Sequence, residues 1–497
     1  MTPRPFIGID LGTSTSGLAH LRSDGQPEIV PNADGERLTP SVVFFDRHES
    51  IKLVGSAAKA AGDPDRTVVG IKRHMDNPEH VVDIDGEKWT PTDLSALILA
   101  KLKRDCSRII GEFEEVVITV PANFNDLARQ ATVNAARIAG LNVTRIVNEP
   151  TAAALYYAHA RKINGRILVY DLGGGTLDVS ILDIEPVTQR ARILLSEGAR
   201  HLGGNHFDEQ IIEIYAEEYR EKHGKELFEN AGDRQRVLQT GEEMKKMLSK
   251  LAFVSGTVGS GEASTRIELT RERFEKAIDR LMTRTVMLIE QALDSVNLKP
   301  ENIDHVVLVG GSTRMPCVRA ILREQFGFNP ISCGNVDECV ALGAALYARQ
   351  ASAVAEVCNQ GYGTLALVEN SMGQVEIQNT VVIPKNTPIP CAITETYETS
   401  EDNEAFIEVD ITQGEDTDPK YVDRIGKITL NVPEGRPAGC RVQVTYSYDE
   451  NQRIRARVTD EQTGLVEELQ IAYQGAGVLS EEDVERKASY LKQVRIE

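Results

Sequence analysis

The sequence predicts an α/β domain followed by a separate all-β domain, and three observations carry this prediction. Up to about residue 350, apolar runs of strand length alternate with longer segments of helical period. From about residue 361 the hydrophobic period changes to two, as at the alternating positions Ala405, Ile407, Val409 and Ile411. Turn residues recur throughout that second half, which is typical of an antiparallel sandwich.

Several elements of the first half have recognisable ends. Residues 116–120 and 306–309 are short continuous apolar runs, as expected of strands buried on both faces. One helix should begin after Thr90, which can cap it ahead of a proline at the first helical position, and end before Gly111. A second helix should span residues 126–138.

The second half should contain the all-β domain and one terminal helix. Ser480 is the expected N-cap of this helix, and Glu481, Glu482 and Asp483 favour its first turn. Since the chain ends at Glu497, we expect only one helix after the β domain. We therefore divide the chain into a first domain at 1–350, a linker at 351–361, a β domain at 362–476 and a C-terminal helix at 477–497.

Composition excludes several classes of protein. The 497 residues are 41% hydrophobic and 26% charged, which is normal for a globular chain and argues against global disorder. The net charge of -20 makes sequence-independent binding of nucleic acid or anionic lipid unfavourable. No stretch approaches the about 20 apolar residues of a membrane-spanning helix, and the N-terminus does not read as a signal peptide, so we expect a cytoplasmic protein. Seven dispersed cysteines predict reduced, mostly buried thiols.

A weak internal repeat is the strongest local feature. Asp10-Leu11-Gly12 and Asp171-Leu172-Gly173 each end an apolar run, and each is followed by a turn of Gly, Ser and Thr and by a second strand. Such turns can point several amides at a phosphate, and the aspartates can anchor Mg²⁺. The alternative is that both are ordinary hairpin turns, but the third loop at 310–313 makes this reading less attractive. No Walker motif occurs, which excludes a P-loop enzyme.

Ordered motifs along most of the chain point to one family. The motifs are GIDLGTSTS at Gly8, VPANFND at Val120, RIAGLNVTRIVNEPTAAAL at Arg137, YDLGGGTLDVS at Tyr170, HLGGNHFD at His201 and LVGGSTRMP at Leu308. In these motifs the sequence resembles the seventy-kilodalton heat-shock chaperones of the DnaK type, within the wider class of actin and sugar kinases. The resemblance implies a two-lobed, actin-like ATPase domain, which is a duplicated ribonuclease H-like fold, followed by an antiparallel β-sandwich that binds peptides.

The resemblance also implies the residues of an ATP site with Mg²⁺. Catalytic roles fall to Lys72, Glu149 and Asp178, and Thr176 matches an autophosphorylation site of bacterial relatives. Asp10 and Asp171 would hold Mg²⁺ through water. Without the family, Lys72 would be read as a solvated lysine and Glu149 as a helix-capping acid. The residues implied to bind ATP or ADP are Gly12, Thr13, Ser14, Thr15, Gly173, Gly174, Gly175, Gly203, Gly204, Glu242, Lys245, Ser249, Gly310, Gly311, Ser312, Arg314 and Asp337.

The β domain would grip an extended peptide. The residues that match the family's pocket and arch are Leu367, Met372, Tyr397, Ser400, Ile407 and Val409. For Ile407 and Val409 the alternative is a purely structural role in the sandwich core. Acidic residues predominate between Glu395 and Arg424, which favours clients with Lys or Arg beside a short apolar stretch.

Two departures from the family pattern matter. The family's leucine-rich linker is replaced by the less apolar run 355–361, so linker docking and ATP-driven opening of the β domain are expected to be weakened. Pro121, Arg129 and Arg145 nevertheless match positions linked to interdomain signalling. The C-terminal helix would be the remnant of a helical lid whose remainder is missing. A peptide clamp without its lid releases peptides readily, which predicts weak and fast client exchange.

We expect an ATP-dependent chaperone without a full lid, which acts on unfolded clients with a J-domain co-chaperone and a nucleotide exchange factor. A sugar-kinase-like enzyme is one alternative, but it has no use for the β domain. The other is a nucleotide-gated adaptor or assembly factor that serves one dedicated partner protein.

Overall fold

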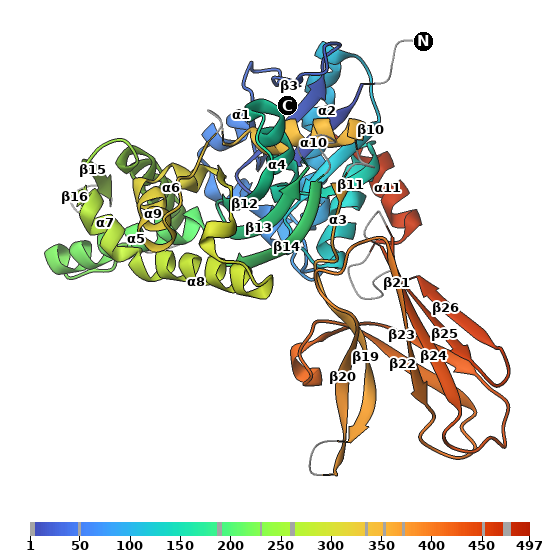
Figure 1. Ribbon diagram of the computed structural model, residues 1–497. Coiled ribbons are helices and arrows are strands. Elements are labelled where there is room, and N and C mark those ends of the chain that lie inside the picture. The colour runs from blue at the N-terminus through green and yellow to red at the C-terminus, as the bar shows by residue number, and fades with distance from the viewer. Residues whose placement is uncertain are drawn as a thin grey trace.

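The computed structural model shows an α/β domain with two central sheets and a β domain that projects from it (Figure 1). It describes residues 5–47, 51–185, 191–228, 231–258, 264–332, 336–350, 354–369, 373–449, 453–470 and 479–497. The helix α10 (Cys339–Gln350) ends the first domain, and the strand β19 (Tyr362–Glu369) begins the second.

The first sheet has the strand order β11-β10-β1-β2-β3, with β4 also paired to β2. The first strand is antiparallel to the second and parallel to the tenth, so the predicted N-terminal hairpin lies in the middle of the sheet. Smaller sheets, β6-β5-β7 and β8-β9, lie beside it. The strands are β1 (Ile7–Leu11), β2 (Thr15–Leu21), β3 (Pro27–Ile29), β4 (Thr39–Pro40), β5 (Val42–Phe45), β6 (Lys52–Val54), β7 (Thr67–Val69), β8 (Val82–Ile84), β9 (Glu87–Trp89), β10 (Glu115–Val120) and β11 (Asn142–Asn148).

The second sheet repeats this arrangement. Its order is β17-β12-β13-β14-β18, with an antiparallel hairpin at β12-β13 and a parallel neighbour at β17. Both predicted hairpins are therefore confirmed, and each presents its turn at the end of a central strand. The strands are β12 (Gly165–Leu172), β13 (Thr176–Ile184), β14 (Ala191–Arg200), β17 (His305–Val309) and β18 (Val354–Ala355).

Two helices separate the sheets, and we call the part built on each sheet the first and the second lobe. The helix α4 (Glu149–Arg161) crosses α10 closely, because a Cβ at Gly343 would lie 1.7 Å from the carbonyl oxygen of Ala152. The remaining helices cover the outer faces, and α5–α9 with the hairpin β15-β16 form the far end of the second lobe (Figure 1). These elements are α1 (Ser56–Ala60), α2 (Pro91–Ile110), α3 (Asp126–Ile138), α5 (Gly204–His223), α6 (Ala231–Leu248), α7 (Arg271–Ala277), α8 (Asp279–Ser295), α9 (Pro316–Phe326), β15 (Phe253–Val258) and β16 (Thr265–Thr270).

The helix ends follow the sequence signals. Thr90 and Asp93 form a capping box, with Pro91 at the first helical position between them. Gly111 follows α2 with a φ of 85° that favours glycine. The predicted helix at 126–138 is confirmed, with the Asn125 side chain accepting the cap bond from the Ala128 amide. These caps fix the entry of both helices, which pack against the first sheet.

The β domain consists of two four-stranded antiparallel sheets, β20-β19-β22-β23 and β21-β24-β25-β26. Their facing side chains, among them Ile411, Ile428, Val444 and Val458, share one core. The alternating pattern around 405–411 is confirmed as the strand β22 (Phe406–Gln413), with its apolar side inward. The other strands are β20 (Val375–Ile383), β21 (Cys391–Glu398), β23 (Asp423–Asn431), β24 (Arg441–Tyr448), β25 (Ile454–Asp460) and β26 (Val466–Gln470).

The C-terminal helix α11 (Glu481–Leu491) starts where the sequence predicts, with a capping box between Ser480 and Asp483. It lies beside α3 on the first lobe (Figure 1), and its buried residues Val484 and Leu491 belong to the core of that lobe. Its assignment as the remnant of a lid remains a prediction, and its buried side packs on the first lobe.

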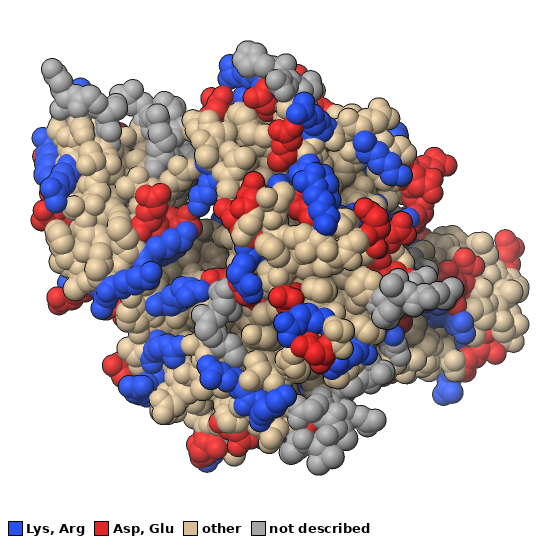
Figure 2. Space-filling view, turned by 90° about the horizontal axis from the view of Figure 1, so that it is seen from above, with Lys and Arg blue, Asp and Glu red and all other residues tan. Residues whose placement is uncertain are grey.

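The cysteines, the hydropathy of the helices and the surface charge of the described residues agree with the sequence analysis. Cys106, Cys339 and Cys358 are buried free thiols and three further cysteines are half-buried, while Cys333 lies outside the described residues. Within the described part of the chain, no helix combines the length and hydropathy needed to cross a bilayer. On the face shown in Figure 2, basic and acidic side chains are interspersed, which is unlike the continuous basic surface of a nucleic-acid-binding protein.

Candidate functional site

Two glycine-rich loops meet at the ends of the two central hairpins. The loop at 12–15 joins β1 to β2, and the loop at 173–175 joins β12 to β13. A Cβ at Gly174 would lie 2.8 Å from Ser14 Oγ, so the loops of the two lobes face each other at close range. A side chain at this position would require Ser14 to change its rotamer.

The carbonyls of these loops are taken up by donors from other segments. Ser41 Oγ donates to the Gly12 carbonyl over 2.8 Å, and Ser312 Oγ donates to the Gly173 carbonyl over 2.9 Å. The Gly204 amide also donates to the Gly173 carbonyl, over 2.9 Å. With their carbonyls held in this way, the loops can offer their amides to an anion.

Four carboxylates and one lysine are gathered behind the loops. Asp10 lies in β1 and Asp171 in β12, opposite Asp178 in the register of β12 and β13. Burial, followed by repulsion from Glu149, raises the pKa of Asp10 and of Asp178 to about 7 and raises the pKa of Asp171 well above its ordinary value. Carboxylates this close together in a buried place repel one another and need cations to offset their charge. Lys72 supplies one such positive charge.

Lys72 and Glu149 form a buried ion pair. Lys72 lies in the short 3-10 turn Ile71–His74, is 5% exposed, and contacts the Glu149 carboxylate with its ammonium group. Glu149 is the first residue of α4, where Asn148 is the N-cap and makes no side-chain cap bond. Lys72 is therefore not the solvated lysine of the alternative reading. Glu149 pairs with Lys72 and is also the acid in the first turn of α4, so its favourable interaction with the helix N-terminus stands beside the ion pair.

The geometry fits a hydrated magnesium ion. Among the described residues, no three His, Cys, Asp or Glu side chains converge closely enough to hold a metal ion directly. Asp178 Oδ1 is buried without a hydrogen-bond partner, and Asp10 Oδ1 accepts from Thr119 Oγ1 over 3.0 Å. Asp10 and Asp171 could therefore hold Mg²⁺ through its waters, which suits an ion that keeps several of them.

One predicted group of nucleoside-binding residues is engaged inside the protein. Glu242 and Lys245 lie one turn apart in α6, whereas Ser249, which the spacing placed on the same helix, lies just beyond its last residue, with its amide donating to the Lys245 carbonyl. Lys245 Nζ donates to Asp208 over 2.8 Å and to the Gly204 carbonyl over 2.7 Å. Lys245 thereby fixes the start of α5 next to the glycine-rich loop at 173–175.

A second group of predicted nucleoside-binding residues lies in and beside the loop that follows β17. Arg314 and Asp337 form an ion pair of 2.6 Å, and a Cβ at Gly311 would lie 3.1 Å from Asp337 Oδ1. Repulsion from Asp337 is also among the causes that raise the pKa of Asp10, after burial and Glu149. The loop at 310–314 therefore lies beside the end of β12, where a Cβ at Gly310 would be 2.8 Å from Asp171 Oδ1.

The linker is docked on the first domain, although its sequence suggested weak docking. Residues Val354–Ala355 pair in parallel with β14 as the outer strand β18, and Val357 is 1% exposed in the core between the lobes. Glu356 accepts a hydrogen bond of 2.8 Å from Asn148 Nδ2. The expectation considered only apolar side chains, whereas backbone pairing and buried polar contacts also attach this linker.

Other contacts hold the base of the β domain against α3. The Tyr362 hydroxyl donates to the Asp126 carboxylate, and the Tyr448 hydroxyl donates to the same group over 3.4 Å. Burial raises the pKa of Asp126 to about 6. Arg129, predicted to lie on an interdomain route, donates to Asn148 Oδ1 over 3.0 Å.

The predicted peptide-binding residues are not all in one environment. Ile407 and Val409 are 8% and 6% exposed in the β-domain core, which agrees with the structural alternative and also with a pocket floor, so their peptide-binding role stays a prediction. Leu367 is 56% exposed. Tyr397 and Ser400 contact Thr380 and Glu404, and Met372 lies outside the described residues.

An exposed apolar surface lies near Leu367. The strand β19 pairs with β22 only over Tyr362, Gly363 and Thr364, after which the hairpin β19-β20 continues alone. Leu367 lies opposite Ile377 on this hairpin, and both are 56% exposed. Phe406, at the start of β22, is 51% exposed. Sequence reasoning missed Ile377 and Phe406, although their strand alternation places them on the face opposite the core.

Other contributors were also missed. Thr119 and Asp208 touch site residues, and Asp126 anchors the β domain. Asp208 and Asp126 lie inside quoted motifs, but a motif does not indicate which of its acids will be buried beside a partner.

A comparison with models of protein families finds a match over nearly the whole chain. The model described as Hsp70 protein matches residues 6–495 of the chain.

Proposed function

Because the chain belongs to the Hsp70 family, we propose that it is an ATP-dependent chaperone that hydrolyses ATP in the cleft between the lobes and binds short extended apolar segments with its β domain. In this proposal the two repeated sheets are actin-like lobes, and the two β sheets form the peptide-binding sandwich. The observation that carries it is the meeting of two glycine loops around a buried cluster of acids.

ATP hydrolysis depends mainly on positioning and on charge stabilisation. The loops at 12–15 and 173–176 bind the β- and γ-phosphates through their amides and hydroxyls. Asp10 and Asp171 hold the waters of Mg²⁺, which when bound neutralises phosphate charge. Lys72 steadies the γ-phosphate, Glu149 fixes Lys72 by the ion pair, and Asp178 has a pKa of about 7 that suits a base for the attacking water.

Peptide binding is assigned to the exposed hairpin pair of Leu367 and Ile377, where β19 leaves β22. An extended segment could add backbone hydrogen bonds to the unpaired part of β19 and place apolar side chains on this surface. A J-domain co-chaperone, a nucleotide exchange factor and a cytoplasmic location are the partners and compartment that the family suggests.

The decisive experiment measures ATP binding and turnover. Calorimetry with Mg²⁺-ATP should show binding by the wild type and loss of binding by Asp10→Asn. The ATPase rate should fall in Lys72→Ala and remain normal in Lys276→Ala, because Lys276 is exposed on α7. Equal ATPase rates in the wild type and Lys72→Ala would disprove the proposed site.

A nucleotide-gated adaptor for one partner protein is the second candidate. It is favoured by the position of α11 on the first lobe, away from the apolar surface of the β domain. A general unfolded client separates the two functions: it should stimulate the ATPase of a chaperone and leave that of a dedicated adaptor unchanged.

A further inference from the structure

The thiol of Cys440 lies beside an arginine in the loop that joins β23 to β24. Cys440 directly precedes β24 and is half-buried, and Arg436 lies earlier in the same loop. We propose that Cys440 is a redox-active modification site, at which hydrogen peroxide oxidises the thiol to a sulfenic acid with the assistance of Arg436. This inference goes beyond ATP hydrolysis and peptide binding and depends on neither.

The Arg436 guanidinium is only partly satisfied by its neighbours. Its Nη2 donates to Asp460 Oδ1 over 2.5 Å, and its Nε donates to Gln462 Oε1 over 3.1 Å. The remaining nitrogen, Nη1, is buried and has no hydrogen-bond partner among the described residues, in a side chain that is 9% exposed. A buried donor without an acceptor is costly, so this nitrogen is suited to receive an incoming oxygen atom.

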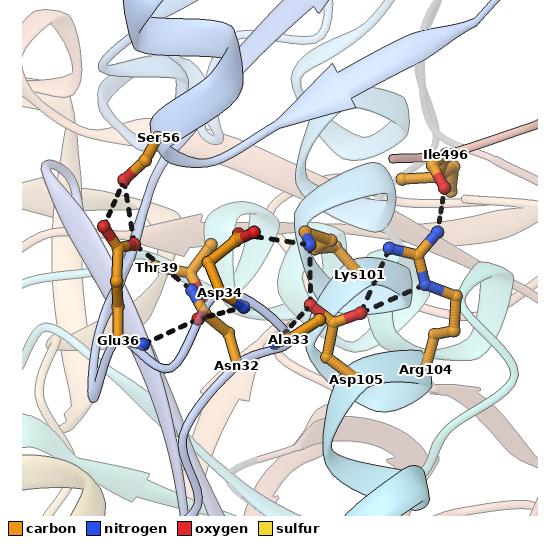
Figure 3. Close-up of polar contacts among 10 residues, drawn as sticks. All are labelled: Asn32, Ala33, Asp34, Glu36, Thr39, Ser56, Lys101, Arg104, Asp105 and Ile496. Carbon is orange, nitrogen blue, oxygen red and sulfur yellow. Dashed lines mark hydrogen bonds and ion pairs between the residues drawn. The ribbon is translucent and has the colours of Figure 1, made fainter.

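Arg104 of α2 shows a fully satisfied guanidinium for comparison (Figure 3). Its Nε and Nη2 donate to Asp105 over 3.1 and 3.0 Å, and its Nη1 donates to the Ile496 carbonyl. Each nitrogen of Arg104 thus has an acceptor, although the side chain is 35% exposed. Arg436 is buried more deeply and yet lacks one acceptor, which is rare for a buried polar group and indicates a missing ligand.

The Cys440 sulfur lies within the same group of side chains. Its thiol can donate to the Pro437 carbonyl over 3.2 Å or to Gln462 Oε1 over 3.3 Å, and the latter oxygen also accepts from Arg436 Nε. Burial opposes the charge of Arg436, but hydrogen bonds with Asp460 and then with Cys440 outweigh it and raise the pKa of the guanidinium. The guanidinium and the sulfur are therefore in contact.

Burial makes other cysteines of the chain less reactive. It raises the pKa of Cys106 and of Cys317 to about 12, and it also raises the pKa of Cys358 and of Cys391. Because the thiolate is the form that attacks a peroxide, these thiols are poor nucleophiles at neutral pH. Cys317 and Cys391 are half-buried like Cys440, so they serve as internal standards for its reactivity.

The reaction balances with hydrogen peroxide as the oxidant. The thiolate sulfur attacks one peroxide oxygen, the S–O bond forms as the O–O bond breaks, and the departing hydroxide takes up the proton released by the thiol to become water. The sulfur is oxidised to a sulfenic acid and the peroxide is reduced. Negative charge builds up on the departing oxygen, where Arg436 Nη1 can donate a hydrogen bond. After the reaction the same nitrogen can donate to the sulfenic oxygen.

The site is joined to the loop that carries Ser400, one of the predicted peptide-binding residues. The Cys440 amide donates to Thr399 Oγ1 over 3.1 Å, and the Thr399 amide donates to the Cys440 carbonyl over 3.0 Å. The Asn403 amide donates to the Arg436 carbonyl over 2.7 Å. Oxidation of Cys440 would therefore take place directly beside the part of the β domain to which the sequence assigns peptide contacts.

Trapping with dimedone, a reagent that labels sulfenic acids, tests the proposal on the full chain. After brief treatment with hydrogen peroxide, peptide mass spectrometry should show labelling of Cys440 about ten-fold faster, or more, than labelling of Cys317 or Cys391. Cys440→Ser should abolish this label and leave the others unchanged. Each cysteine is read separately and neither ATP nor a peptide is added, so a failure of the proposed function would not affect the result.

Substitutions of Arg436 test its role in the oxidation. Arg436→Lys keeps a positive charge for Asp460 but removes the second donor arm, and it should slow labelling of Cys440 about ten-fold. R436Q/D460N removes both charges of the pair together and should slow labelling as much, without leaving a buried charge unpaired. Arg441→Gln is the control, because it removes a positive charge from the exposed residue next to Cys440 and should leave the rate unchanged.

Either of two results would overturn the proposal. One is labelling of Cys440 in the wild type that is no faster than labelling of Cys317 and Cys391, a comparison that needs no variant. The other is an unchanged labelling rate in Arg436→Lys and R436Q/D460N, once circular dichroism and urea unfolding have shown that these variants are folded. The first result would make Cys440 an ordinary thiol, and the second would remove Arg436 from the reaction.

Discussion

The Nδ2 of Asn148 donates a hydrogen bond of 2.8 Å to the carboxylate of Glu356, and the residue after Asn148 is Glu149. The linker therefore contacts the residue that directly precedes Glu149, the acid that pairs with Lys72. Arg129 holds the other end of the Asn148 amide over 3.0 Å. A displacement of the linker would release Asn148 and change the start of α4, which is a direct physical route from the β domain to the ATP site.

Linker docking should depend on pH through Glu356. Burial raises the pKa of Glu356 from 4.5 to about 7, so the docked state is free of a penalty below pH 4.5 and loses stability as the pH rises toward 7. The loss should be on the order of 3 kcal/mol at pH 8, at about 1.4 kcal/mol per pKa unit. Hydrogen exchange of residues 354–361 should be faster at pH 8 than at pH 6 after correction for intrinsic rates.

Glu356→Gln should remove most of this pH dependence, since the amide stays neutral. The exposed Glu395→Gln on β21 is the control and should retain it. An equal pH dependence in wild type and Glu356→Gln would assign the effect to another group, such as Asp126, whose pKa burial raises to about 6.

Much of the fold follows from local signals in the sequence. The capped helices after Thr90 and Asn125, both central hairpins and the strand at Ile407 form where period, caps and turns predict. The position of α11 does not follow, because its amphipathic pattern indicates that one face is buried but not which surface covers it. The pairing of residues 495–497 with β6 is equally non-local.

For the candidate site, residue types were predictable and their surroundings were not. The aspartates at the ends of β1 and β12 are readable from the repeat. Whether Ile407 lines a pocket or fills the core depends on how two sheets pack, and strand alternation is the same in both cases. Docking of the linker through Glu356 depends on Asn148, which lies 208 residues away in sequence.

Asp171→Asn should stabilise the protein in the absence of nucleotide. Burial, then repulsion from Glu149, raises the pKa of Asp171 well above 3.8, so apo stability is lost progressively as the pH rises above the ordinary carboxyl pKa. A neutral amide removes this penalty, so the variant should gain apo stability at pH 8. Thermal unfolding should show a higher apo Tm for the variant and no further increase with Mg²⁺-ATP.

The surface variant Asp183→Asn serves as the control for Asp171→Asn. Asp183 pairs with Arg166 on the same hairpin at 2.9 Å and is 34% exposed, so its loss should lower Tm slightly. A lower apo Tm for Asp171→Asn than for the wild type at pH 8 would show that the carboxylate is not under repulsion.

Glu149→Gln should separate turnover from binding. The amide is of similar size but cannot pair with Lys72 as an ion, so Lys72 and the attacking water lose their orientation. We expect kcat to fall by about 10²–10⁴-fold, while ATP affinity changes little because the phosphate loops are intact. Single-turnover hydrolysis with radiolabelled ATP measures this, with the exposed Glu324→Gln as control. A parallel loss of affinity and turnover would make Glu149 a binding residue instead.

Substitutions in the β domain should distinguish its surface from its core. Leu367→Asp and Ile377→Asp alter side chains that are both 56% exposed, so they should weaken binding of an apolar peptide about ten-fold or more without lowering stability. Ile407→Ala removes a side chain that is 8% exposed and should destabilise the β domain by about 2–5 kcal/mol. Fluorescence anisotropy of a labelled peptide and urea unfolding measure the two effects.

Because acids predominate around 395–424, peptides flanked by Lys should bind better at low salt. If Leu367→Asp binds normally while a folded Ile407→Ala does not, the peptide lies over the core strand and not on the hairpin.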